Sequence, residues 1–199
     1  MKKITIATII LATTHITTAK ANTDGFYLGG TLGTTHLDIS SYSGTENSYG
    51  LISGYQFNHH LALEAQAFKT GNYHINPEQN AIKETQYQGR LNAQGISLAP
   101  KFIWPFHDTF SVYAKAGVSY TEINFDVYST NTNENPLNDI DGWGYQFGLG
   151  IDAEMLPNWT IHLGYDFISG NLNENNAGQN VDKTTVKLTQ FNFGLHYNF

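Results

Sequence analysis

The sequence predicts an all-β fold, an eight-stranded antiparallel up-and-down transmembrane β-barrel, and three observations predict it. Eight segments alternate apolar side chains with small or polar ones, which is the period of a β-strand. Aromatic residues lie at the ends of many of the apolar faces, as in the interfacial girdles of membrane barrels. The connections between the segments are alternately short and long, as in a barrel with tight turns at one membrane face and loops at the other.

The eight strands can be justified in chain order. They are predicted over residues 26–36, 47–57, 61–67, 91–104, 110–123, 143–155, 159–167 and 190–199. Their apolar faces carry, in the same order, Phe26, Leu28 and Leu32; Tyr49, Leu51 and Tyr55; Leu61, Leu63 and Ala65; Ile96, Leu98 and Phe102; Phe110, Val112 and Val118; Trp143, Tyr145 and Phe147; Trp159, Ile161 and Leu163; and Phe191, Phe193 and Leu195. Only the fourth strand contains an irregularity. Pro100 cannot donate to a ladder, so we expect a bulge or locally broken pairing there.

A soluble β-sandwich also alternates, so the opposite face decides between the two folds. That face is rich in glycine, which suits a narrow lumen and is unusual on a solvated surface. It also carries charged or titratable residues, which need partners if they point into a barrel. These are Glu64, Lys101, Lys115, Asp152, His162 and Asp166. We expect Glu64 and Asp152 to surround Lys101, Lys115 or His162 within the lumen, with Asp152 and Asp166 as neighbours of His162.

The links between strands predict how the barrel is oriented. The short ones cover residues 58–60, 105–108 and 156–158, and the long polar ones cover 37–46, 68–90, 124–140 and 168–186. In barrels of the bacterial outer membrane the short turns are periplasmic and the long loops are extracellular. The four loops are therefore candidate contacts for a host or surface ligand, which their polar composition does not identify.

The first 21 residues have the organisation of a Sec signal peptide. Lys2 and Lys3 form a basic start, residues 4–11 are mostly apolar, and Ala19-Lys20-Ala21 has the small-x-small form of a cleavage site. We expect a signal peptide over 1–21, a barrel domain over 22–199, and export to the outer membrane of a Gram-negative cell.

The composition excludes several classes of protein. Cleavage after Ala21 removes three lysines and leaves 7 basic and 17 acidic residues, a net charge of −10, which is not typical of nucleic-acid binding. The lack of cysteine excludes a disulfide framework, a thiolate nucleophile and a lipidated cysteine. Beyond the signal no run reaches the ~18–20 apolar residues of a transmembrane helix.

The chain resembles the transmembrane domain of the outer membrane protein A family over nearly all of residues 22–199. The resemblance is carried by Gly25-Phe26-Tyr27-Leu28-Gly29-Gly30, Gly54-Tyr55-Gln56-Phe57-Asn58, Leu63-Glu64-Ala65, Tyr113-Ala114-Lys115-Ala116-Gly117 and Gly142-Trp143-Gly144. It implies an inward, salt-bridged plug in which Glu64, Lys101 and Asp152 match three of four family positions. His162 stands at the fourth, where the family has an arginine. We expect no peptidoglycan-binding domain, because the chain stops at its eighth strand.

Two other functions are alternatives to a structural or surface-interaction role. A lipid-modifying enzyme such as a lipid A deacylase needs a serine activated by histidine and an orienting acid, but no serine follows His162 at the His-x-Ser spacing. A narrow gated pore is the other alternative. Side chains fill the lumen of an eight-stranded barrel, so such a pore would conduct at most narrowly and intermittently. We therefore expect no enzyme activity and no cofactor. We also expect no metal site, because the adjacent side chains of His59 and His60 point apart at the end of a strand.

The last strand predicts how the protein reaches its membrane. Phe199, Tyr197 and Leu195 lie on its lipid-facing side and end in a terminal aromatic residue. This stripe resembles the signal read by the barrel-assembly machinery, so these residues are the predicted assembly signal. The other expected partners are outer-membrane lipids and lipopolysaccharide, and we expect a monomer.

Overall fold

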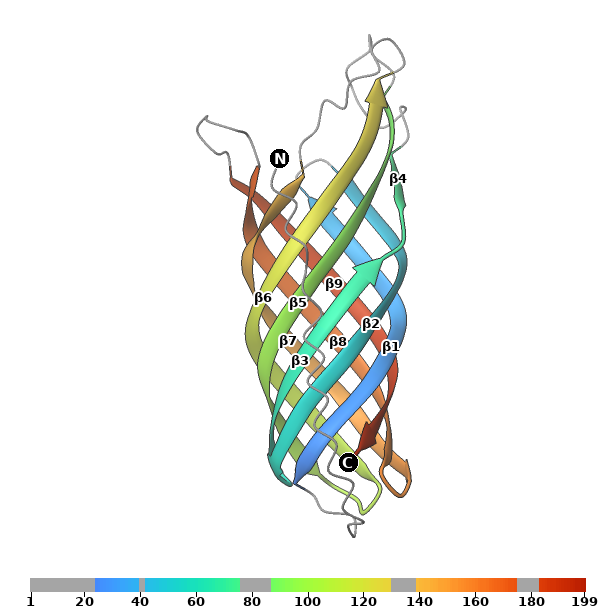
Figure 1. Cartoon of the computed structure of the whole chain (residues 1–199), viewed down its shortest axis with the longest axis vertical. Coiled ribbons are helices and arrows are strands. Elements are labelled where there is room, and N and C mark those ends of the chain that lie inside the picture. Colours follow the sequence, from blue (N-terminus) through green and yellow to red (C-terminus); the bar gives the residue numbers. More distant parts are fainter. Residues whose placement is uncertain (1–23, 40–41, 76–86, 130–138, 175–182) are drawn as a thin grey trace.

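A computed structural model describes residues 24–39, 42–75, 87–129, 139–174 and 183–199 (Figure 1). The described residues form strands and turns, with no helix among them. The strands are β1 (Gly25–Ile39), β2 (Tyr42–Asn58), β3 (Leu61–Thr70), β4 (Tyr73–Ile75), β5 (Tyr87–Pro105), β6 (Phe110–Ser129), β7 (Ile140–Leu156), β8 (Trp159–Glu174) and β9 (Lys183–Asn198). The predicted signal peptide, residues 1–21, lies outside this description.

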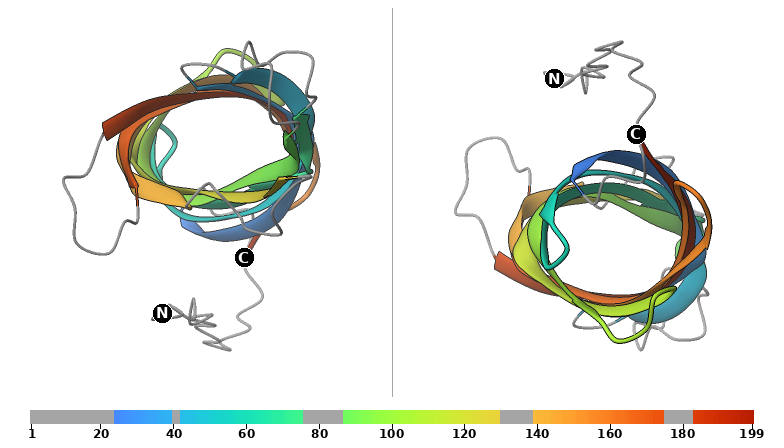
Figure 2. Two further views of the ribbon diagram at one scale, coloured as in Figure 1. Left: turned by 90° about the horizontal axis from the view of Figure 1, so that it is seen from above. Right: turned by 90° about the horizontal axis from the view of Figure 1, so that it is seen from below.

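The strands close into a barrel. Consecutive strands pair antiparallel except β3 and β4, and β1 pairs with both β2 and β9, so the sheet returns on itself. Strands β3 and β4 both pair with β5 and together occupy one strand position of the barrel. The nine strands therefore form an eight-stranded barrel. Viewed along the barrel axis, the ribbon is a closed ring (Figure 2). The predicted eight-stranded antiparallel barrel is therefore confirmed.

The short turns all lie at one end of the barrel, called here the turn end, and the opposite end is the loop end (Figure 1). His59 and His60 join β2 to β3, residues 106–109 join β5 to β6, and Pro157-Asn158 joins β7 to β8. Asn158 has a φ of 70°, the left-handed conformation that asparagine tolerates in tight turns. Register shifts between Gln56 and Asn58 and between Glu154 and Leu156 lie beside two of these turns.

The strands extend further toward the loop end than predicted. The predicted loops 37–46, 68–90, 124–140 and 168–186 each contain strand residues, so their boundaries were wrong. In these extensions the outward positions are polar, as at Asp38, Thr45 and Lys187, while inward positions such as Leu37 and Leu188 are buried. Toward the loop end the apolar side chains therefore lie on the inward face of the strand instead of the outward face. The end of the outward apolar pattern does not mark the end of backbone pairing. Residues 40–41, 76–86, 130–138 and 175–182 lie outside the described parts.

Pro100 interrupts the ladder as predicted, and it does so without a bulge. The β5–β6 register runs from Leu98 opposite Val118 to Lys101 opposite Lys115, with two intervening pairs missing and the register unchanged. On its other side Pro100 lies opposite Leu63 of β3. The missing N–H of proline thus costs pairing only locally.

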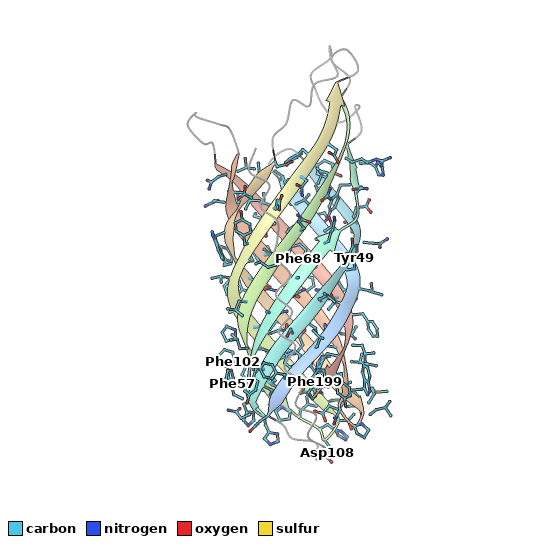
Figure 3. All side chains as sticks on the ribbon, in the orientation of Figure 1. Tyr49, Phe57, Phe68, Phe102, Asp108 and Phe199 are labelled. Atoms are coloured by element: carbon cyan, nitrogen blue, oxygen red, sulfur yellow. The ribbon has the colours of Figure 1, made fainter. Side chains whose placement is uncertain are left out.

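A broad apolar belt covers the outside of the barrel. Phe26, Leu51, Trp143, Leu149 and Tyr165 each expose more than half of their surface, although all are apolar or aromatic. Figure 3 shows Phe57, Phe102 and Phe199 near the turn end. Exposed apolar area of this extent is typical of a lipid-facing surface and would make a soluble protein aggregate.

This belt generates a prediction for Leu149, which lies midway along β7 and is 64% exposed. Leu149→Arg should lower the free energy of unfolding by about 2–4 kcal/mol, the cost of an arginine at the bilayer midplane. Urea unfolding in phospholipid vesicles measures this change. Asn173→Arg, at an exposed position near the loop end of β8, is the control and should leave stability unchanged. Equal tolerance of both substitutions would contradict a lipid-facing belt.

Candidate functional site

Five buried charged side chains meet in the lumen. Glu64 lies on β3, Lys101 on β5, Lys115 on β6, Asp152 on β7 and Asp166 on β8, and each has an exposed fraction of 7% or less. All occupy inward positions of their strands, because side chains alternate between the two faces of a sheet. Closure of the barrel brings together residues up to about a hundred positions apart in the sequence.

These side chains form a continuous chain of ion pairs, called here the ionic layer. Lys115 Nζ lies 3.0 Å from Glu64 Oε1 and 3.1 Å from Asp166 Oδ1. Lys101 Nζ lies 2.8 Å from Asp152 Oδ2 and 3.5 Å from Glu64 Oε2. Glu64 therefore joins the two lysines. Two ammonium groups face three carboxylates, so the layer carries one excess negative charge when all five groups are ionised.

Neutral side chains complete the hydrogen bonding of the ionic layer. The Tyr27 hydroxyl donates to Glu64 Oε2 at 2.9 Å, and Lys115 also donates to Gln66 Oε1 at 3.0 Å. Gln146 and Asn192 donate to the two oxygens of Asp166 at 3.1 and 3.0 Å. Buried carboxylates need such donors, since unsatisfied polar groups in a low-dielectric interior are costly.

Two tyrosines pack against Lys101. Its Nζ lies 4.0 Å from the ring centroid of Tyr113 and 5.9 Å from that of Tyr27. A cation over an aromatic face is stabilised by the ring quadrupole, by about 2 kcal/mol when it is desolvated. Sequence reasoning did not include Tyr113, Gln66, Gln146 or Asn192 in the site. The sequence could have indicated them, because they occupy the same alternate, inward-facing positions of their strands as the charged residues.

Comparison with known proteins identifies the family. Residues 4–199 match the model of the "Outer membrane protein beta-barrel domain". The chain belongs to this family of outer-membrane β-barrels. Its place in the outer membrane follows from this membership.

Relatives of this outer-membrane barrel include outer membrane protein A of Serratia marcescens, 23% identical over 208 residues, which span 100% of this chain and 56% of the relative. Virulence membrane protein PagC of Salmonella typhimurium is 27% identical over 129 residues, which span 58% of this chain and 63% of PagC. The chain thus spans about half to two thirds of the length of these relatives.

Solved structures share the fold at low identity. Neisserial surface protein A matches with a TM-score of 0.62 and 18% identity, over 88% of this chain and 97% of that one. OprG of Pseudomonas aeruginosa matches with a TM-score of 0.61 and 16% identity, over 89% and 97%. Ail of Yersinia pestis, solved with the heparin analogue sucrose octasulfate, matches with a TM-score of 0.55 and 12% identity, over 87% and 99%.

His162 lies beside the ionic layer of this outer-membrane barrel without joining it. It is buried, stands opposite Asp152 in the β7–β8 register, and has its ring 6.0 Å from that of His196. Among the described residues its Nδ1 has no hydrogen-bond partner, and no ion pair includes its ring. Gly194 makes room for it, because a Cβ there would lie 2.0 Å from His162 Cε1.

Gly148 gives the ionic layer its space. A Cβ at this position would lie 2.2 Å from Asp166 Oδ1 and 2.7 Å from Lys115 Cε. Both distances are far below van der Waals contact, so a larger residue would displace the ion pair. The glycine of the inward face is thus part of the charged site.

The predicted assembly-signal residues lie away from the lumen. Phe199 and Leu195 are 69% and 43% exposed, and the Tyr197 ring lies 5.1 Å from those of Phe199 and Trp159. The Phe199 N–H donates to the Phe26 carbonyl at 2.8 Å, which extends the contact between the two ends of the sheet. Recognition of these residues by the assembly machinery stays a prediction.

The ionic layer generates a stability prediction for Lys115. Lys115→Met should lower the free energy of unfolding by about 3–5 kcal/mol, because it leaves buried carboxylates without their cation. Urea unfolding in detergent micelles measures the loss. Adding Asp166→Asn should recover part of it, since the double variant removes a charge of each sign. A loss below ~1 kcal/mol, the value of an exposed pair, would contradict the buried network.

Proposed function

We propose that this outer-membrane protein is a structural barrel with a sealed lumen, which presents its loop end to partners at the cell surface. The observation that carries the proposal is the filling of the lumen by two successive layers of side chains. One is the ionic layer, whose contacts of 2.8–3.5 Å across five strands leave little room for an ion to pass.

The second is an apolar layer nearer the loop end. It consists of Leu37, Phe68, Tyr73, Leu91, Ala93, Ile123, Ile140, Ile168, Leu172, Val186 and Leu188. Beside Ile168, Leu172, Val186 and Leu188 a residual cavity of about 10 Å³ holds one water at most. An apolar constriction resists wetting and therefore opposes ion flow. The two layers in series support a plug over the narrow-pore alternative.

The loop end supports a role at the surface. Its outward strand extensions carry polar side chains that lie beyond the apolar belt, and the family's fold places such loops on the outside of the cell. Among described loop-end residues, Asp38, Glu46, Glu122, Asp126, Asp139 and Asp141 outnumber Lys69, Arg90 and Lys187. This acidic balance argues against a sulfated polyanion such as that bound to Ail, and favours a neutral or cationic partner.

The described residues offer little support for a lipid-modifying enzyme. The Ser43 hydroxyl lies 3.3 Å from His36 Nε2 at the exposed end of β1 and β2, but His36 Nδ1 contacts the Thr45 hydroxyl at 2.9 Å. A serine nucleophile needs a base oriented by an acid, and a hydroxyl is a poor substitute for the carboxylate. This contact is therefore better explained as surface hydrogen bonding.

The sealed lumen generates a conductance prediction. In planar lipid bilayers the wild-type barrel should show no steady single-channel conductance. Glu64→Ala with Lys115→Ala should also stay closed, because the apolar layer remains. Adding Leu37→Ala and Tyr73→Ala should produce stepwise conductance, with heat-modifiable gel migration as the check on folding. Steady wild-type current, or equal current in the double and fourfold variants, would contradict two barriers in series.

The surface role generates a labelling prediction. The chain has no cysteine, so a single introduced cysteine is the only thiol that a maleimide can label. Asn173 is exposed near the loop end, and Asp108 is exposed at the turn end (Figure 3). In intact cells a membrane-impermeant maleimide should label Asn173→Cys and should label Asp108→Cys only after the outer membrane is permeabilised. The reverse pattern would invert the proposed orientation and remove the loop end from the surface.

A further inference from the structure

The turn end of the barrel contains a cavity that the sealed lumen does not explain. It has a volume of about 520 Å³, which lies within the usual range of ligand sites. Asp108 and His107 lie at its mouth in the β5–β6 turn, Glu154 lines its wall, and Asp152 and His196 lie at its buried floor. Figure 3 shows Asp108 at the extreme turn end.

The floor of the cavity has buried polar atoms without hydrogen-bond partners. Asp152 uses Oδ2 for Lys101, while its Oδ1 is buried and has no hydrogen-bond partner in the described structure. His196 Nδ1 is also buried and unpartnered, and both residues are less than a tenth exposed. The ionic layer already lacks one positive charge, since two lysines face three carboxylates. Asp152 also lines the cavity, so the carboxylate charge that no lysine balances lies beside the cavity floor.

The walls continue this negative character toward the mouth. Glu154 follows Asp152 by two residues on the inward face of β7, a separation of about 6.6–6.8 Å along a strand. Asp108 lies in the exposed turn, and the uncharged polar residues Gln56, Thr160 and Asn198 also line the cavity. Among the described residues that line the cavity there is no lysine or arginine.

We propose that this cavity binds a linear organic polyammonium ion, with one ammonium group on Asp152 and the next on Glu154. The separation of the two residues along the strand is similar to that of amines joined by a short methylene chain, and N–H donors suit the hydroxyl and amide oxygens of the wall. Asp152 and Glu154 follow one another on the inward face of a single strand, and the described residues contain no group of three His, Cys, Asp or Glu side chains placed to hold a metal. A chain-like cation therefore fits the site better than a single divalent ion.

The proposal is independent of the sealed lumen and of the orientation, because the cavity lies on the turn-end side of the ionic layer. Its test is calorimetric titration of the mature barrel in uncharged detergent micelles with spermidine, at about pH 8, where imidazoles are ordinarily neutral. Wild type should show saturable one-to-one binding. Asp152→Asn should weaken the affinity by at least about tenfold, and Glu154→Gln by about threefold to tenfold. Asp38→Asn, an exposed carboxylate at the loop end, is the control of equal charge and should leave the affinity unchanged.

Three outcomes would overturn the site. They are the absence of saturable binding, an equal loss in Asp38→Asn, and displacement of spermidine by an equimolar amount of Mg²⁺. The second would mean that net charge attracts the amine without a site, and the third that any cation satisfies it. Glu154 is exposed and lies outside the ion pairs, so Glu154→Gln decides the question if Asp152→Asn does not fold.

Discussion

The pairing of β1 with β9 is the contact on which the rest of the structure depends. It runs from Tyr27 opposite Asn198 to Ile39 opposite Val186 and joins the two ends of the sheet. In hydrocarbon an unpaired backbone group costs several kcal/mol, so a sheet that crosses a membrane must have no edge. Closure at eight strand positions also fixes a narrow interior, in which the side chains of the ionic and apolar layers meet across the lumen. The ionic and apolar layers are consequences of that confinement.

Confinement explains why charge is tolerated inside. Lys101 and Lys115 are almost fully buried, yet each contacts two carboxylates, and Tyr113 covers Lys101 from the side. Buried ion pairs add little stability on their own, because desolvation offsets their attraction. Their value lies in specificity: a register slip of one residue in β5 or β6 would turn a lysine toward lipid. The ionic layer thus penalises incorrect pairings more than it stabilises the correct one.

The strands within the membrane were predictable from the sequence because lipid imposes a strict alternation, so the pattern from Trp143 to Met155 predicted most of β7. The charged members of the lumen were predictable from the same parity. Beyond the belt the outward face meets water, and the apolar residues Leu37, Leu172 and Val186 point inward instead. Composition alone reads such a stretch as a loop. Other features depend on which strands face one another across the lumen. They are the contacts of Tyr113 and Asn192, the unpaired oxygen of Asp152 and the turn-end cavity. The periodicity of a single strand carries no information about these contacts between strands.

One strand position of the barrel is divided into β3 and β4, so backbone pairing along this part of the wall is not continuous. On the loop-end side of Ser48, β2 keeps its ladder with β1. Toward β4 it has no ladder among the described residues. The contacts there include a Gly71 N–H bond to the Asn47 carbonyl, a 3.4 Å hydrogen bond from the Tyr42 hydroxyl to the His74 carbonyl, and an edge-on contact between the Tyr42 and Tyr73 rings. A sheet resists shear through its ladders, so stiffness falls from the turn end to the loop end along this seam. The wall beside Tyr42 and Tyr73 is therefore held by fewer backbone bonds than the charged cross-section nearer the turn end. Rigidity in the bilayer and compliance at the rim are thereby combined in one continuous sheet.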